Sequence, residues 1–325
     1  MAYNVTGLNA YTKENVDQLV KASLFDARTM REILANGNVL TDVKSSEKIN
    51  RFETDVFFQD DSNCGFNASG TTTYTQRTLT VGKVKINEIL CEKDLEPYYT
   101  QMALKAGGEY TSLAFAADYS ERKAGKIAEA LEVAAWQAST AGSAGTNGLL
   151  NKFDGIKKLI SDAGSTVVNA NVSGFYGSGA PITGIDSSTK AINAVKAVIK
   201  ALPAKIKGKS DLRIWMGWDA FSLLVDGYIS LNLFNYAKNE KYDEDNASFV
   251  VPGTNYTVIP VHGLDGTDDI YAFRMSNIYY GTDLLGEENQ FWIRFSEDDE
   301  NIKFTARMKA GFQFAFMDEI VKFEA

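Results

Sequence analysis

The chain has 325 residues, of which 45% are hydrophobic and 12% aromatic, which is enough for two or three packed modules. Its net charge is −9, from 42 acidic and 33 basic residues, and this argues against a dedicated nucleic-acid binder, which needs clustered lysine and arginine, although it allows a local basic patch. No run of eighteen apolar residues and no signal-peptide pattern occurs, so we expect a cytosolic chain without a membrane span.

The first 45 residues are typical of a peripheral segment. One amphipathic helix is expected near residues 13–22 and a second over residues 28–35, where Gly37 gives the stop signal. We therefore predict an N-terminal arm over residues 1–45 rather than a domain.

A long antiparallel hairpin is predicted for residues 46–95. Turn-forming residues 60–69 separate an alternating strand from the stretch "GTTTYTQRTLTVGKVKINEIL". About twenty residues of this stretch, 70–90, would span about 65 Å as a strand, more than the roughly 50 Å diameter of a globule of this size. The first strand is half-covered in this interpretation, with one face formed by Phe52, Thr54, Val56 and Phe58 and the other by Arg51, Glu53 and Asp55.

Gly82 marks a change of phase in the second strand of this hairpin. The apolar residues Leu79 and Val81 occupy odd positions, whereas Val84 and Ile86 occupy even positions. A glycine at such a switch is typical of a bulge or bend. We predict that the hairpin protrudes before Gly82 and joins the body of the protein after it.

A long helix is expected from residue 118, with Ser120 as N-cap, over roughly 20 residues. After the flexible "STAGSAGTNG", helices at residues 188–201 and from Trp218 alternate with the strands "LRIWMG", "NYTVIPV", "DIYAFRM" and "NIYYG". This alternation indicates an α/β module. The closing stretch "NIKFTARMKAGFQFAF" alternates strictly and predicts a long strand.

Residues for catalysis, cofactor binding or metal binding are not assigned. His262 is the single histidine and follows a buried strand, and the glycine-rich stretch at Gly177 lacks the lysine and serine or threonine of a phosphate loop. Asp265, Asp268 and Asp269 could chelate a hard cation, or simply form a turn, so a metal-dependent or carbohydrate-active enzyme stays as an alternative.

Cysteine usage is sparse. Cys64 and Cys91 fit neither a disulfide framework nor a metal cluster, so we expect free thiols. Cys64 would lie at the hairpin tip, where an intersubunit disulfide is the alternative.

The order of these elements resembles the major capsid proteins of tailed bacteriophages, which have the Hong Kong 97 fold. The stretches "SGTTTYTQRTLTVGKVKINEILCEKDLEPYY", "TKAINAVKAVIKALP" and "IKFTARMKAGFQFAF" carry the resemblance. It implies an α+β fold with an N-terminal arm (1–45), an extended loop (46–95), a peripheral domain with a spine helix (96–165 and 291–325) and an axial domain (166–290). The extended loop would lie across a neighbouring subunit, and the expected contact residues are Arg51, Glu53, Asp55, Thr71, Thr73, Tyr74, Thr75 and Arg77, with Gly82 at the bend.

The resemblance also implies a function without catalysis or cofactors. Pentamers and hexamers of the chain would form an icosahedral shell around a double-stranded DNA genome, made in the host bacterial cytoplasm, with no sequence-specific DNA binding. Separate scaffolding, portal and decoration proteins are the expected partners. Covalent cross-linking through the tip is not expected, because no lysine lies between Lys48 and Lys83. The rival interpretations are an encapsulin-type compartment and a tail or decoration protein.

Overall fold

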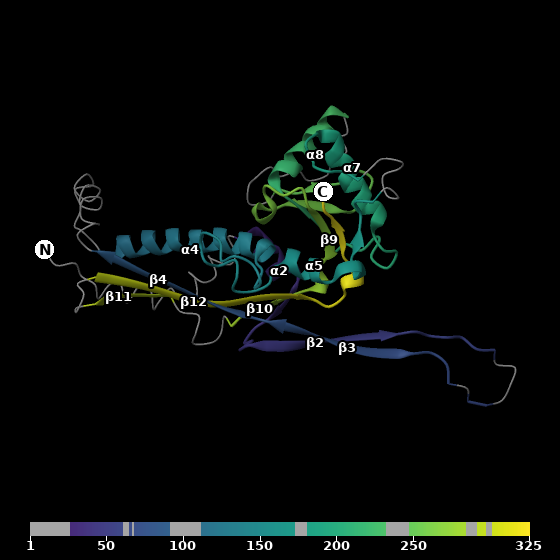
Figure 1. Ribbon diagram of the computed structural model, residues 1–325, viewed down its shortest axis with the longest axis horizontal. Coiled ribbons are helices and arrows are strands. Elements are labelled where there is room, and N and C mark those ends of the chain that lie inside the picture. The colour runs from purple at the N-terminus through teal and green to yellow at the C-terminus, as the bar shows by residue number, and fades with distance from the viewer. Residues whose placement is uncertain are drawn as a thin grey trace.

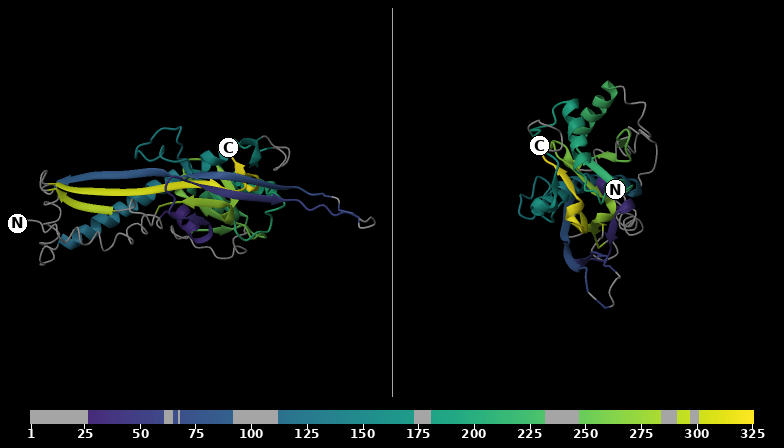
Figure 2. Two further views of the ribbon diagram at one scale, coloured as in Figure 1. Left: turned by 90° about the horizontal axis from the view of Figure 1, so that it is seen from below. Right: turned by 90° about the vertical axis from the view of Figure 1, so that its right-hand side faces the viewer.

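The computed structural model describes residues 27–60, 65–66, 68–91, 112–172, 181–231, 247–283, 291–296 and 301–325. A long helix lies along a long sheet, an α/β lobe stands on one end of this layer, and a hairpin projects beyond it (Figure 1). Figure 2 shows the same layer from below, with the hairpin continuing the line of the sheet past the lobe.

The long sheet has five strands built around β12 (Asn301–Phe314). Residues 301–310 of β12 pair antiparallel with β4 (Gly82–Cys91) on one side, and residues 301–306 pair antiparallel with β11 (Phe291–Ser296) on the other. Its last residues pair with β10 (Ile278–Gly281), which pairs in parallel with β1 (Asn38–Leu40). The alternation predicted for β12 is confirmed, because the residues buried on one face are Ile302, Phe304, Ala306, Ala310, Phe312 and Phe314.

Helix α4 (Ser112–Gln137) packs on this sheet and has 26 residues. Its buried face is the predicted one and includes Ala124, Ile127, Leu131 and Ala135. The predicted start was wrong, because the helix already includes Ser120 and begins six residues before residue 118. Leucine and alanine in "SLAFAADY" are strong helix formers, and they continue the helix past a serine that only resembles an N-cap.

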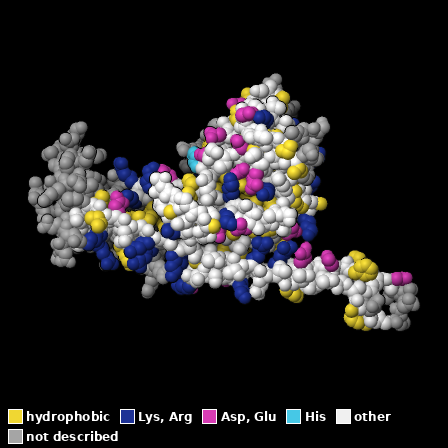
Figure 3. Space-filling model, in the orientation of Figure 1, with side chains coloured by type: hydrophobic (Ala, Val, Ile, Leu, Met, Phe, Trp, Pro, Cys, Tyr) yellow, Lys and Arg dark blue, Asp and Glu magenta, His cyan; other side chains and the backbone are white. Residues whose placement is uncertain are grey.

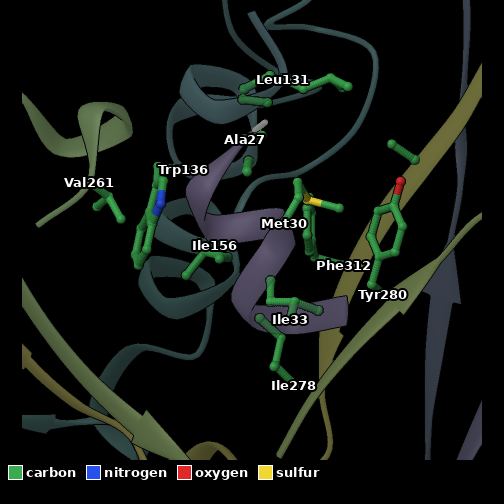
Figure 4. Close-up of a cluster of buried hydrophobic side chains, with 14 of the residues drawn as sticks. Ala27, Met30, Ile33, Leu131, Trp136, Ile156, Val261, Ile278, Tyr280 and Phe312 are labelled. Carbon is green, nitrogen blue, oxygen red and sulfur yellow. The ribbon is translucent and has the colours of Figure 1, made fainter. Parts of the chain in front are cut away.

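Two shorter helices complete this layer. Helix α2 (Arg28–Asn36) lies between α4 and β10, where Met30 and Ile33 pack among side chains from both elements (Figure 4). Helix α5 (Ile156–Asp162) follows the loop after α4 and is followed by the short η1 (Gly164–Thr166). The helix expected at residues 13–22 lies outside the described residues.

The lobe is a six-stranded sheet in the order β5-β13-β9-β6-β8-β7. Helices α7 (Ser188–Ala201) and α8 (Trp218–Ser230) pack on it through a second hydrophobic core. The strands are β5 (Val168–Asn169), β6 (Leu212–Met216), β7 (Phe249–Val250), β8 (Thr257–Pro260), β9 (Ile270–Arg274) and β13 (Val321–Phe323), and the short helices beside them are η3 (His262–Leu264), η4 (Met275–Asn277) and η5 (Met317–Glu319).

Strand pairing does not follow the domain bounds drawn from the sequence. Strand β10 was placed in the axial domain but pairs with β12 in the long sheet, and β13 was placed in the peripheral domain but pairs with β9 in the lobe. Both are short buried strands, and their local hydrophobic pattern would suit either sheet. The chain therefore passes between the long sheet and the lobe more often than the predicted domain bounds imply.

A buried carboxylate joins α2 to α4. Glu132 accepts hydrogen bonds from the backbone nitrogen of Thr29 at 2.9 Å and from its hydroxyl at 2.6 Å, and Trp136 Nε1 donates to the same hydroxyl at 2.7 Å. Burial raises the pKa of Glu132, while the hydrogen bonds from Thr29 and the nearby charges of His262 and Arg28 oppose that rise.

We expect the free energy of unfolding of the wild type to fall, relative to that of Glu132→Gln, as pH rises from about 4 through the raised pKa of Glu132. The folded state holds the Glu132 proton more tightly than the unfolded state, so raising pH favours unfolding by up to about 1.4 kcal/mol per pH unit. Urea unfolding of both proteins across this pH range measures the difference. If the wild type instead became more stable relative to Glu132→Gln as pH rises, the raised pKa of Glu132 would be contradicted.

Candidate intersubunit hairpin

The extended hairpin consists of β2 (Ser46–Thr54) and β3 (Thr72–Thr80), which form an isolated two-stranded antiparallel sheet. Its register places Ile49 opposite Arg77 and Phe52 opposite Tyr74. After one residue the chain changes partner, since β3 pairs with β2 whereas β4, which begins at Gly82, pairs with β12. The predicted change of phase therefore falls where the projecting strand becomes a strand of the body.

The base of the hairpin, residues 46–51 and 77–80, is part of the folded body. Ile49 and Leu79 are buried in a small core with Val43, Val81 and Ala315. The side-chain amide of Gln313 on β12 also donates to the carbonyl oxygen of Thr78 at 2.9 Å. These contacts fix the direction in which the rest of the hairpin leaves the molecule.

A cluster of charged side chains connects the base of the hairpin to the lobe. The Arg51 guanidinium lies 2.9 Å from a Glu53 carboxylate oxygen and 3.4 Å from one of Asp318, and it stacks 4.7 Å from the ring centre of Phe316. Lys205 lies 3.5 Å from Glu53 and 3.9 Å from Asp318. Arg51 and Glu53, two of the expected intersubunit contact residues, therefore also have partners within their own chain.

Arg77 also lies at this base and is half-buried. Burial lowers the pKa of its guanidinium, and the charge of Arg51 lowers it further, while Asp318 raises it. Six of the eight expected contact residues lie within residues 52–76 and are exposed: Glu53, Asp55, Thr71, Thr73, Tyr74 and Thr75.

The distal half of the hairpin, residues 52–76, is exposed at every residue that the structure describes. Phe58 is 90% and Phe66 97% exposed, and Val56 and Phe57 are also exposed. Phe52 and Tyr74 cover one another in part, with ring centres 5.2 Å apart, but both remain open to solvent. The half-covered face expected for the first strand is therefore uncovered beyond the base within one chain (Figure 3).

The charged side chains of the distal half are all acidic. Residues 52–76 contain Glu53, Asp55, Asp60 and Asp61 but no lysine or arginine. Exposed apolar patches on soluble proteins mark surfaces that bind partners. The distal half thus has the properties of a contact surface for a partner with apolar and basic groups. Cys64 lies outside the described residues.

Gly82 lies directly against the backbone of the loop that follows α4. A Cβ atom there would overlap the carbonyl oxygen of Lys152 and lie 2.7 Å from its carbonyl carbon and 3.0 Å from Phe153 Cβ. Only glycine leaves room for this approach, which holds the start of β4 against the loop after α4.

We expect Gly82→Ala to lower the free energy of unfolding by about 1–3 kcal/mol, because the clash is with backbone that must shift. The matched control is Gly125→Ala on α4, where a Cβ would meet no atom within 4 Å. That change should raise stability by about 0.5–1 kcal/mol. Chemical denaturation of both variants tests this, and equal stability of Gly82→Ala and the wild type would contradict it.

Three of the residues considered for chemistry, His262, Asp265 and Asp269, have structural partners. His262 Nδ1 lies 2.6 Å from an Asp265 carboxylate oxygen, and the other oxygen of Asp265 accepts from the Trp218 backbone nitrogen at 2.8 Å, at the start of α8. Asp269 pairs with Lys157 at 2.5 Å. Among the described residues, no three histidine, cysteine, aspartate or glutamate side chains are grouped to hold a metal ion. The stretch around Gly177 lies outside the described residues.

None of the helices in the described part of the chain has the length and apolar character needed to cross a membrane.

Comparisons with known proteins find similarity in structure but not in sequence. No family model and no curated protein matches the sequence. Among solved structures, the chain is similar to a protein in the satellite phage P4 procapsid with its size determination protein, at a TM-score of 0.59 and 9% identity, covering 94% of this chain and 89% of that one. It is also similar to the capsid of an empty GTA particle, at a TM-score of 0.53 and 13% identity, covering 92% and 89% of the two chains.

A third similar structure is the virus-like particle from Pyrococcus furiosus, at a TM-score of 0.51 and 9% identity, covering 96% of this chain and 98% of that one. These likenesses span nearly the whole chain, so the capsid fold that the sequence resembles is confirmed.

Proposed function

We propose that this chain is the major capsid protein of a tailed phage, and that its copies assemble into an icosahedral shell around double-stranded DNA. The observation that carries this proposal is the hairpin, whose base is packed into the body while its distal half exposes Phe57, Phe58 and Phe66 to solvent. An isolated two-stranded hairpin is marginally stable in water, and these side chains gain burial only by contacting another molecule. The capsid fold of the similar structures supports a second copy of the chain as that molecule.

The two layers have distinct proposed roles. The layer of α4 and the long sheet would be the peripheral domain, with α4 as the spine helix, and the lobe would be the axial domain that meets its copies within pentamers and hexamers. The exposed residues Asp55, Thr71, Thr73, Tyr74 and Thr75 would contact the neighbouring subunit. Threonine side chains and the acidic charge of the distal half would limit unspecific pairing before assembly.

The proposed role is structural rather than enzymatic. The shell would be made in the host bacterial cytoplasm and become part of the virion, with separate scaffolding, portal and decoration proteins as partners. The net charge of −9 suits a wall that confines DNA without binding it in a sequence-specific manner.

A second candidate is an encapsulin-type compartment that encloses protein cargo, since one of the similar structures is described as a virus-like particle and not as a phage capsid. The contents of the particles separate the two. Particles from the native source are treated with nuclease, opened and analysed for DNA and protein. We expect protected double-stranded DNA, whereas a folded enzyme without DNA would favour the compartment.

A further inference from the structure

A large cleft lies between α4 and the long sheet, beside the loop of residues 146–152, and its volume is about 610 Å³. Sites for compact organic ligands typically have volumes of roughly 300–1,000 Å³ and mostly apolar walls, with a few polar groups that orient the ligand. None of the residues considered for chemistry above lines this cleft. It is therefore a separate candidate for a binding site.

The interior of the cleft is apolar. Leu131 of α4 and Phe304 of β12 form its floor, and both are almost fully buried. The walls above them are formed by side chains that pack against the main core but stay half-buried: Val84, Ile86, Ala130, Leu150 and Met308. A ligand with a hydrocarbon body would bury these side chains further, which is favourable in proportion to the apolar area removed from water.

The rim of the cleft is positively charged. Four lysines are in the lining: Lys85, Lys123, Lys126 and Lys152. Glu129 is the one acidic residue among the described residues of the lining, and it pairs with Lys126 at 2.6 Å, while Lys123 pairs with Glu88 on β4. Four lysines against two glutamates leave a net positive charge. Basic and apolar side chains lie beside each other over this part of the molecule (Figure 3).

The loop that closes one side of the cleft is held in place. The backbone nitrogen of Ser139, just after α4, donates to the carbonyl oxygen of Leu150 at 2.7 Å, and the nitrogen of Leu150 donates to that of Ala144 at 3.2 Å. Leu149 is buried in the main core. Because these contacts exist without a ligand, the cleft is preformed, and a ligand would lose little affinity to ordering the loop.

An apolar floor below a positive rim is complementary to a molecule with a hydrocarbon body and an anionic head. We propose that this cleft binds a single-chain amphipathic anion from solution, with its chain over Leu131 and Phe304 and its carboxylate or phosphate among the lysines. This inference does not depend on the proposed shell function. The carbonyl oxygen of Lys152 lies against Gly82, where the hairpin joins the body. A ligand held beneath this loop therefore stabilises that joint.

Titration calorimetry of the purified full chain with hexanoate, octanoate and decanoate, below the concentrations that form micelles, tests the proposed chemistry. We expect one saturable site whose affinity rises about fourfold for each added methylene, because each is buried against the floor. Decyltrimethylammonium has the same chain with the opposite charge, and it should bind at least about tenfold more weakly. Absence of saturable decanoate binding, or equal affinity for the cation, would overturn the proposal.

Two kinds of variant locate the site. Ala130→Met fills the cleft from α4 with a good helix former and should lower the affinity for decanoate at least about tenfold. Lys126→Gln with Lys152→Gln should weaken decanoate by a similar factor and leave the neutral decanol unchanged. The matched control is Lys207→Gln with Lys209→Gln, two exposed lysines on the lobe, which changes the net charge equally and should leave both affinities unchanged. Unchanged decanoate affinity in the first two variants would contradict the site.

Photoaffinity labelling gives a test that needs no substitution. Decanoate that carries a diazirine on its chain is bound to the wild type and irradiated, and the labelled peptides are identified by mass spectrometry. We expect labels within residues 84–86, 127–133, 146–150 or 304–308, and labels only elsewhere would overturn the proposal. The chain should also stay in solution with vesicles of phosphatidylglycerol. Sedimentation with these vesicles that is lost in Lys126→Gln with Lys152→Gln would show a membrane surface as the ligand instead.

Discussion

Replacing residues 53–73 with Asn-Gly should leave a folded chain that builds no shells. Phe52 and Tyr74 lie directly opposite each other, so a two-residue turn can join them without changing the register of the base. The buried base residues Ile49 and Leu79 are retained, whereas the exposed aromatic residues of the distal half are lost. Thermal unfolding followed by circular dichroism measures folding, and sedimentation velocity measures assembly.

The control for this experiment is Leu79→Ala in the full-length hairpin. Leu79 is fully buried, so its truncation should lower stability by about 2–5 kcal/mol while the distal half stays intact. A deletion that includes Leu79 would therefore unfold the base. Loss of assembly could then not be separated from loss of folding. Unfolding of the Asn-Gly variant would show that the distal half belongs to the core of its own subunit.

Lys309→Met should lower the free energy of unfolding by about 3–5 kcal/mol, because it leaves the buried Asp283 without its main partner. The Lys309 and Asp283 side chains are 3% and 0% exposed, and Nζ lies 2.7 Å from the carboxylate. Lys309 also donates to the carbonyl oxygen of Lys44 at 3.2 Å, beside the base of the hairpin. Among the described residues, the other cation paired with Asp283 is Lys44, which is largely exposed and lies 3.4 Å away.

The double variant Asp283→Leu with Lys309→Met is the control, and it should recover most of the lost stability because no charge stays buried. The hydrogen bond from Lys309 lowers the pKa of Asp283. The stabilisation by this pair is therefore present above the ordinary aspartate pKa of about 3.9 and is lost as pH falls through the lowered pKa. Urea unfolding from pH 7 downward measures both effects, and a Lys309→Met variant as stable as the wild type would contradict this account.

The elements with strong periodicity were predictable from the sequence. Strict alternation in β12 and the apolar face of α4 each reflect burial on one side, and the structure confirms both. The position of Gly82 at the transition between β3 and β4 also follows from a local change of phase. In these cases the residues that determine the structure are close together in the chain.

Features that depend on distant parts of the chain were not predictable. Arg51 and Glu53 alternate like solvent-facing residues of a strand, and nothing near them indicates that Asp318 and Lys205 complete a cluster at the base. A cleft beside α4 is likewise lined by four separate segments: residues 84–86, 123–133 and 146–152, and strand β12. One local signal was available, because Val56, Phe57 and Phe58 are three consecutive apolar residues that break the alternation, and all three are exposed.

Electron microscopy of the purified full chain, alone and co-expressed with the proposed scaffolding protein, tests the shell function most directly. The account predicts pentamers, hexamers and closed icosahedral shells in which each hairpin reaches a neighbouring copy. A chain that stays strictly monomeric under both conditions, with Phe58 and Phe66 still exposed, would contradict it.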